Sequence, residues 1–417
     1  MFPPFNAIGA VRTSKTAKFL TELGFEVKVV SCANQSLAEN LPLEIPEKMV
    51  RYTPWVNVNS PVEFFLGGKK KVAQKGFVPS SNFLPSWIKK LGFVYRSLIN
   101  FPDGQIGWYP FACQAGNQII RQWTPDLIYA SAIPYTSLLV ASSLSRRNKI
   151  PWIAELRDLW TDNPNRVMPR WRQYLEEKLE RRVLSSASGL VTVSEPLAET
   201  LRSKYSIPCE VIRNGFDPED SPAPSDIPFS NGVVRIVYTG QLYNCQQDPT
   251  PLFKALKWMG KESEMVEIHF YGRYLDFVSE LALKYDVRHL IKTHEPVSYK
   301  ESVTIQAQSD LLLLFPGYDH SYRGVYTGKL FEYLGARRPI LSLGNMEGVA
   351  ANLIREHSAG TTLTDFEQIA QQIRSWIKQK KDNGCIPFLP PKTDLGLTRK
   401  EQTKALARFL SNCLKNL

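Results

Sequence analysis

The sequence lacks the patterns of a membrane-spanning helix, a disulfide framework and a metal site. Its 417 residues contain no run of about eighteen apolar residues, which a membrane-spanning helix needs. The six cysteines form no Cys-x-x-Cys pair, so we expect reduced thiols in a cytoplasmic protein and no zinc site. No Asp-x-Asp motif occurs, and Met1 runs straight into Phe2-Pro3-Pro4, so we expect neither a motif-bound metal nor a secretory signal.

Two further absences restrict the chemistry. No G-x-G-x-x-G sequence follows a predicted strand, which disfavours a dinucleotide. All five histidines lie at or after position 269, so the first half has no imidazole to act as a general base. A base there would have to be a carboxylate.

Positive charge is the main excess. The formal net charge is +11, while 43% hydrophobic and 22% charged residues are typical of a folded globular protein, and the length suits two domains. Between Gly67 and Asn100, seven basic residues alternate with aromatic residues and no acidic residue occurs. The mixture suits an anionic membrane surface better than a nucleic acid, because no nucleic-acid-binding module is recognisable; a solvated loop explains it equally well. The basic residues are Lys69, Lys70, Lys71, Lys75, Lys89, Lys90 and Arg96.

Helices and strands alternate along the first half. A loop from Phe5 to Gly9, a helix over 12–23 and a strand over 25–30 make most of a βαβ unit, whereas 40–61 is predicted to be irregular. The strand that should precede this helix would have ended before Met1, so we expect the first strand to be missing. Further strands are predicted over 127–131, 150–155 and 189–193, with helices over 108–123, 135–146 and 170–185.

The second half repeats the alternation after a Pro-, Ser- and Asp-rich linker. Strands are predicted over 233–240, 266–272, 311–315 and 340–344, with a helix over 250–259. The predicted fold class is α/β, with Rossmann-like domains at 1–217 and 233–390 joined by a linker at 218–232. Residues 391–417 are predicted to carry a helix, 398–414, that returns to the first domain.

One stretch, Tyr326 to Pro339, combines several signals. Thr327 is a good N-cap, and Leu330, Phe331 and Leu334 form an apolar stripe. The helix N-terminus together with Lys329 is suited to hold a phosphate, and Glu332 is suited to accept hydrogen bonds from a sugar hydroxyl. The alternative is an ordinary amphipathic helix with an intrahelical Lys329–Glu332 pair.

Several short motifs, taken in order, resemble those of the family 4 (GT-B fold) glycosyltransferases, in the branch that carries Lys-Leu-Phe-Glu-Tyr. They are Ile8-Gly9…Arg12, Gly24-Phe25-Glu26-Val27, Asp103…Gly107-Trp108-Tyr109-Pro110, Pro125-Asp126-Leu127-Ile128-Tyr129, Arg157-Asp158-Leu159-Trp160, Val193-Ser194-Glu195, Arg213-Asn214-Gly215-Phe216-Asp217, Tyr238-Thr239-Gly240 and Gly328-Lys329-Leu330-Phe331-Glu332-Tyr333. The resemblance implies two Rossmann-like domains facing a cleft. It also implies transfer of a sugar from a nucleotide donor in the C-terminal domain to an acceptor in the N-terminal one, in polysaccharide, lipid or O-antigen assembly.

The resemblance implies a role for individual residues. Glu332 matches the glutamate that holds the donor ribose, and the pyrophosphate is expected beside Val325, Thr327 and Lys329. Gly9 and Gly240 are expected to let backbone approach the phosphates. Asn214 is also assigned to the donor site, while Arg157 and Asp158 are expected to face the cleft as catalytic residues.

Two departures from the family pattern stand out. The first of the family's paired glutamates would fall at Gly324, so its contacts to the sugar hydroxyls are missing. The basic pair expected after Gly240 is replaced by amide residues, and Arg273 or Arg323 is the candidate replacement. The amide residues are Gln241, Asn244, Gln246 and Gln247.

For the reaction, we expect helix-end amides and positive charge to stabilise the leaving diphosphate without a metal or other cofactor. Retention is favoured, because an inverting reaction would need Asp158 as base. Asp158 is alternatively structural, paired with Arg157 or Arg166.

The expected partners are a nucleotide-sugar donor, a glycan or lipid-linked acceptor and the anionic inner face of the plasma membrane. No nucleic acid is expected. Two other functions remain open at this point: an inactive GT-B binding subunit and a nucleotide-sugar epimerase.

Overall fold

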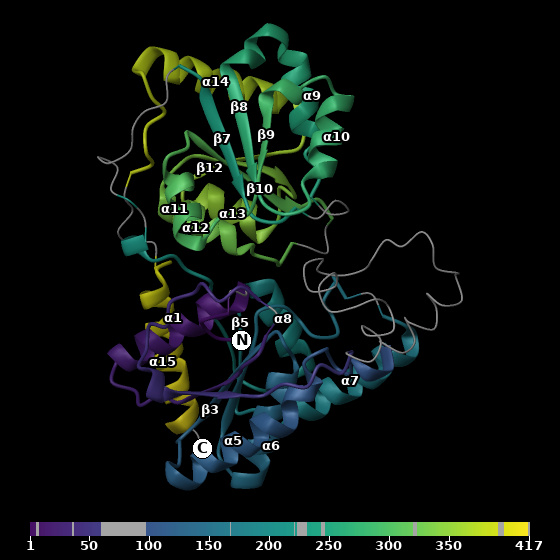
Figure 1. The fold of residues 1–417 in the computed structure, drawn as a ribbon, viewed down its shortest axis with the longest axis vertical. Coiled ribbons are helices and arrows are strands. Elements are labelled where there is room, and N and C mark those ends of the chain that lie inside the picture. The colour runs from purple at the N-terminus through teal and green to yellow at the C-terminus, as the bar shows by residue number, and fades with distance from the viewer. Residues whose placement is uncertain are drawn as a thin grey trace. The chain divides into compact units, whose positions relative to one another are not determined.

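The computed structural model describes residues 1–5, 8–35, 37–59, 97–166, 168–220, 222, 232–242, 247–319, 323–390 and 396–415 (Figure 1). Most of the basic and aromatic segment between Gly67 and Asn100, and most of the predicted linker at 218–232, lie outside these residues. The chain divides into two compact units, which we describe separately: unit 1 is Met1–Ile212 with Thr403–Leu417, and unit 2 is Arg213–Gln402. The sequence placed the domain boundary at 218–232.

Unit 1 is built from parallel strands and intervening helices. Its elements are α1 (Ile8–Glu22), β1 (Val29–Cys32), β2 (Val50–Thr53), α5 (Tyr109–Gln122), β3 (Ile128–Ala132), α6 (Thr136–Asn148), β4 (Trp152–Leu156), α7 (Arg170–Leu184), β5 (Gly189–Thr192), α8 (Glu195–Lys204), β6 (Cys209–Val211) and, from Thr403 on, α15 (Arg399–Lys415). β1 pairs with β2, and a second sheet has the order β3-β4-β5-β6. In the described residues no strand precedes α1, and no strand pairing joins the two sheets.

The core of unit 1 lies on both faces of the β3–β6 sheet. Trp152 and Trp160 are fully buried on one face, where the Trp160 indole donates to Glu176 Oε2 at 2.9 Å. On the other face, Leu406 and Leu410 of α15 pack with Ile153 of β4. The last helix is therefore part of the core of unit 1.

Unit 2 carries a six-stranded parallel sheet in the order β12-β11-β10-β7-β8-β9. Its elements are β7 (Val234–Thr239), α9 (Thr250–Met259), β8 (Val266–Tyr271), α10 (Asp276–Lys284), β9 (Ile291–His294), α11 (Tyr299–Ala307), β10 (Leu311–Gly317), α12 (Gly328–Ala336), β11 (Ile340–Gly344), α13 (Val349–Glu356), β12 (Gly360–Leu363) and α14 (Phe366–Asn383). One face packs against α9, α10 and α14, and the other against α12 and α13.

The strand order of unit 2 positions its site. The chain adds β8 and β9 on one side of β7 and then β10, β11 and β12 on the other. Ligands of open α/β sheets bind at the carboxyl ends of the strands at such a switch point, which here lies between β7 and β10. All seven residues of β10 are buried, as expected for the middle of a parallel sheet.

Three sequence predictions in unit 1 were wrong. The strand predicted over 25–30 lies at Val29–Cys32, because strand pairing begins only where Val29 meets Val50. That partner strand, β2, lies in the stretch predicted to be irregular. The predicted loop from Phe5 to Gly9 also ends too late, because α1 begins at Ile8 and Gly9 lies in its first turn.

Candidate functional site

The helix predicted at the centre of the site is α12. It follows β10 at the carboxyl edge of the unit 2 sheet, and Leu330, Phe331 and Leu334 bury the predicted apolar stripe. It ends at Ala336, before Pro339, because Arg337 adopts a left-handed conformation with φ of 58°. Its first turn is thereby fixed at the switch point.

Thr327 occupies the N-cap position, but its hydroxyl does not cap the helix. The backbone is extended there, with φ −79° and ψ 141°, and no side-chain cap bond forms. Thr327 Oγ1 is buried and has no hydrogen-bond partner in the described part of the chain. The predicted position is confirmed and the predicted cap bond was wrong. The hydroxyl and the first amides of α12 can therefore serve a ligand.

Lys329 points towards the end of β7. Its ammonium lies 5.2 Å from the centroid of the Tyr238 ring, and burial lowers the pKa of Lys329 while Glu332 opposes that shift. Lys329 and Glu332 form no ion pair with each other in the described residues, so the intrahelical pair is wrong. The partly buried ammonium is left without a bonded carboxylate.

Gly240 makes room for Lys329. Its φ is +117°, and a Cβ there would lie 2.3 Å from Lys329 Cε. The loop at Gly272 packs directly against the Gly240 backbone, because a Cβ on Gly272 would lie 2.3 Å from the Gly240 carbonyl oxygen. A side chain at position 240 would displace the lysine.

We expect Gly240→Ala to reduce affinity for a diphosphate by about tenfold, because the methyl group pushes the Lys329 ammonium away from one charge-assisted contact. Gly24→Ala is the matched control, since its φ is +90° but nothing lies within 4 Å of the added Cβ. Calorimetric titration of both variants measures the effect. Equal affinities in the two variants would contradict the role of Gly240.

Glu332 is half-buried and held by Gln306 of α11. Gln306 Nε2 lies 3.2 Å from Glu332 Oε2, 2.9 Å from Thr239 Oγ1 and 3.1 Å from Ser302 Oγ. Burial raises the pKa of Glu332, and the Gln306 hydrogen bond and the Arg399 charge oppose the rise. One carboxylate oxygen is thus fixed, and Oε1 makes no hydrogen bond to a described residue.

We expect Gln306→Leu to shift the pH dependence of nucleotide binding. Ionised Glu332 accepts stronger hydrogen bonds than the protonated acid does, so binding weakens as the pH drops through its raised pKa. Removing the amide donor raises that pKa further. Calorimetry across pH should therefore place the Gln306→Leu midpoint above that of the wild type. Gln308→Leu, an exposed change one residue beyond α11, should leave it unchanged. Coincident midpoints in all three proteins would refute the positioning role.

Sequence reasoning missed the residues that support Glu332. Thr239 N–H donates to the Tyr333 hydroxyl at 3.3 Å, which ties the end of β7 to α12. Arg399 Nη1 lies 2.7 Å from Asp217 Oδ2 and 3.4 Å from the Tyr299 hydroxyl. No spacing rule connects Gln306, Tyr299 or Arg399 to the α12 motif. Only the fold brings them together.

The remaining predicted donor residues are spread over unit 2. Asn214 lies in the loop after β6 and Val325 in the segment before α12; both are partly exposed. Arg273 and Arg323 are exposed, and neither side chain has a bonding partner among the described residues. The structure brings Gly240, Lys329 and Glu332 together around the first turns of α12.

The predicted residues of unit 1 meet at the carboxyl end of β4. Arg157 donates from Nε to Ala132 O at 2.7 Å and from Nη2 to Ile133 O at 3.1 Å. A Cβ on Gly9 would lie 2.4 Å from Arg157 Nη1, so the glycine lets the guanidinium lie against the first turn of α1. This end of α1 therefore carries one extra positive charge.

Asp158 has no ion-pair partner in the described part of unit 1. Burial raises its pKa, and the Arg157 charge opposes the rise. Arg166, one of its predicted structural partners, pairs instead with Glu176 at 2.7 Å. Neither Arg157 nor Arg166 forms an ion pair with Asp158, so the predicted pairing was wrong, and the role of Asp158 stays a prediction.

The described residues contain neither a metal-binding cluster nor a membrane-spanning helix. No group of three or more His, Cys, Asp or Glu side chains gathers in a way that would hold a metal ion. None of the described helices is long and apolar enough to cross a bilayer.

The two parallel α/β units, with a helix N-terminus at the switch point of unit 2, have the architecture of the GT-B fold class. The family model described as Glycosyltransferase Family 4 matches residues 9–220, and the chain belongs to this family. It is therefore an enzyme of sugar transfer. No curated protein sequence matches the chain.

Solved structures agree on the fold. The chain is similar to a glycosyltransferase from Rickettsia africae, with 12% identity and a TM-score of 0.57 over 98% of this chain and 95% of the other. It is similar to WaaG, a glycosyltransferase involved in lipopolysaccharide biosynthesis, with 13% identity and a TM-score of 0.54 over 98% and 93%. It is also similar to Anabaena HepE in complex with UDP and glucose, with 18% identity and a TM-score of 0.55 over 79% and 90%.

Proposed function

We propose that the protein transfers a sugar from a nucleotide-sugar donor to a glycan or lipid-linked acceptor in the assembly of a cell-surface polysaccharide. The donor binds in unit 2 and the acceptor is served by unit 1. The reaction is metal-independent and retaining, and the chain belongs to the branch marked by Lys329 to Tyr333.

The observation that carries the proposal is the state of Glu332. Its Oε2 is fixed by Gln306 while Oε1 makes no hydrogen bond to a described residue, which supports a role in binding two ribose hydroxyls. The ammonium of Lys329 and the uncapped start of α12 lie in the turn before Glu332, where a diphosphate is attracted by charge and by free N–H groups. The UDP and glucose bound to the similar HepE support this choice of ligand.

The proposed chemistry needs no general base from unit 1. The bond between the anomeric carbon and the diphosphate oxygen breaks, its electron pair stays on the diphosphate, and the acceptor hydroxyl forms the new bond. In a retaining reaction the leaving phosphate takes the acceptor proton, so no imidazole is required. Arg157, at the first turn of α1, and Lys329 supply positive charge for the leaving group, and Asp158 orients the acceptor hydroxyl.

We also propose that the protein binds the anionic cytoplasmic face of a membrane, where a lipid-linked acceptor would lie. The excess of basic residues between 67 and 100 supports it, and the relation of WaaG to lipopolysaccharide agrees with a lipid-linked or glycan acceptor.

The test is a calorimetric panel of nucleoside diphosphates and their sugars against the wild type, Lys329→Ala and Lys378→Ala. We expect the wild type to bind one nucleotide class and Lys329→Ala to lose about tenfold or more in affinity, since one charge-assisted contact is gone. The exposed Lys378 of α14 is the matched control and should bind as the wild type does. No binding of any nucleotide, or equal binding by both variants, would exclude the proposed site.

The two alternative functions, an inactive binding subunit and a nucleotide-sugar epimerase, predict different products when the same protein is assayed for activity. An inactive binding subunit would bind the nucleotide sugar but release no nucleoside diphosphate with any glycan or lipid-linked acceptor. An epimerase would convert the sugar of the donor without an acceptor. We expect acceptor-dependent release of the nucleoside diphosphate.

A further inference from the structure

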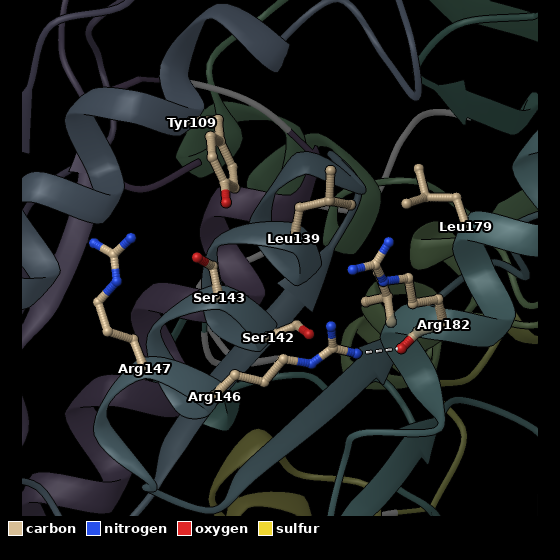
Figure 2. Close-up of a pocket in the computed structure, with 9 residues that line it drawn as sticks. Tyr109, Leu139, Ser142, Ser143, Arg146, Arg147, Leu179 and Arg182 are labelled. Atoms are coloured by element: carbon tan, nitrogen blue, oxygen red, sulfur yellow. Dashed lines mark hydrogen bonds between the residues drawn. The ribbon is translucent and has the colours of Figure 1, made fainter.

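Unit 1 contains a cavity of about 530 Å³ between α5, α6 and α7 (Figure 2). Three arginines, three hydroxyl-bearing side chains and three aliphatic side chains line it. It opens to solvent, because Arg146, Arg147 and Arg182 are all exposed.

The three arginines come from two helices and lack acidic partners. Arg146 and Arg147 lie in the last turn of α6, and Arg182 lies in the last turn of α7. No carboxylate in the described part of the chain pairs with any of them. Arg146 Nη2 donates to the Arg182 carbonyl oxygen at 2.6 Å, which holds one guanidinium in place and leaves its other N–H groups available. The cavity therefore concentrates positive charge that the described residues do not neutralise.

Hydroxyl groups lie between the guanidinium groups. In Figure 2 the hydroxyls of Tyr109, Ser142 and Ser143 lie between Arg147 on one side and Arg182 on the other. Ser142 Oγ lies 3.0 Å from Ser186 Oγ, so its position is fixed. Hydroxyls and guanidinium groups facing one space are the donors that proteins use for phosphate oxygens.

The cavity is separate from the predicted catalytic residues of the same unit. α6 and α7 lead into the amino ends of β4 and β5, so their last turns lie at that edge of the sheet. Arg157 and Asp158 follow the carboxyl end of β4. A ligand in the cavity would not occupy the positions assigned to the reaction.

An apolar stripe runs along α7 towards the cavity. Trp171, Tyr174 and Leu175 are 42%, 56% and 44% exposed, although large side chains of this kind are usually buried. Their spacing places them on the helix face that continues to Leu179, which lines the cavity, and Arg182. The arrangement combines a cationic cavity with an apolar approach, which suits an amphiphilic anion.

We propose that this cavity binds a phosphate group, carried either on a lipid headgroup or on a soluble phosphate ester. Charge-assisted hydrogen bonds from Arg146, Arg147 and Arg182 hold the phosphate oxygens, and the exposed stripe of α7 contacts the apolar part of a lipid. The proposal stands apart from donor binding in unit 2.

Two probes distinguish the sources. Glycerol 3-phosphate is titrated by calorimetry, and phosphatidylcholine vesicles with and without phosphatidic acid are tested by co-sedimentation of the full chain. We expect the wild type to bind phosphatidic acid vesicles more tightly than neutral ones. Binding of glycerol 3-phosphate with similar affinity would assign the cavity to soluble phosphate esters. Vesicle binding alone, weakened by substitution of the cavity arginines, would assign it to lipid.

The variants test the cavity itself. The triple substitution Arg146→Gln/Arg147→Gln/Arg182→Gln should reduce affinity for the bound probe by about tenfold or more. Arg181→Gln is the matched control, because Arg181 lies in the same last turn of α7 but does not line the cavity. If the triple variant fails to fold, Arg147→Gln alone gives the answer, since this exposed side chain bonds no described residue. Equal binding by the cavity variants and Arg181→Gln, or no binding of either probe by the wild type, overturns the proposal.

Discussion

Glu332→Gln should abolish sugar transfer while leaving the fold intact. The amide is isosteric but uncharged, and one of its two terminal atoms donates instead of accepting. The charge-assisted hydrogen bonds to the donor are therefore lost, and kcat/KM should fall by about 100-fold or more. Stability should not fall with it. Burial raises the pKa of Glu332, which means that its ionised form is less favourable in the folded protein than in the unfolded chain. Removing its charge should leave the unfolding temperature equal or higher, a combination typical of functional residues.

The measurements are steady-state release of nucleoside diphosphate and thermal unfolding. Glu367→Gln on α14 is the matched control, since this exposed glutamate lies in the first turn of its own helix. It should retain full activity. Loss of activity accompanied by a clear drop in the unfolding temperature of Glu332→Gln would instead mark Glu332 as a structural residue.

Lys380→Met should destabilise unit 2 by about 3–5 kcal/mol, the cost of breaking a buried ion pair from one side. Lys380 Nζ lies 2.6 Å from Asp310 Oδ2 and 2.7 Å from the Val233 carbonyl, and the two side chains are only 2% and 8% exposed. Asp310 also accepts the Arg235 N–H at 2.8 Å, at the start of β7. Losing the lysine removes the cation that forms an ion pair with this buried carboxylate.

Denaturant unfolding of three variants separates the charge from the packing. Lys378→Met, two residues away and exposed, should change stability by no more than about 0.5 kcal/mol. The double variant Lys380→Met/Asp310→Asn should recover part of the loss, because the amide oxygen still accepts the Arg235 N–H and the carboxylate charge is removed together with its cation. A double variant no more stable than Lys380→Met would show that packing, and not charge, sets the effect.

The second half of the fold was predictable because its signals are local. The continuous apolar run of β10 and the apolar stripe of α12 appear directly in the sequence, and α9 was predicted with its observed bounds, Thr250–Met259. The strand order of unit 2, by contrast, depends on pairings between distant segments. β2 was missed for that reason, since its four residues are a strand only beside β1.

The site was predictable where one helix carries it and not where several elements meet. Thr327, Lys329 and Glu332 are neighbours on α12, so a motif could identify them. Whether Lys329 pairs with Glu332 or reaches Gly240 depends on the loop after β7, which no spacing within α12 reveals. Gln306 lies 26 positions from Glu332 and is placed by α11. Its part in the site follows only from the tertiary structure.

Hydrogen–deuterium exchange with and without the bound nucleotide sugar tests the central claim most directly, because it locates the ligand without any substitution. We expect ligand protection in peptides that cover the first turns of α12 and the Gly240 loop, with no change in helix α14, which packs on the opposite face of the sheet. Protection confined to unit 1, or absent from residues 325–336 when the nucleotide is bound, would contradict donor binding at Glu332.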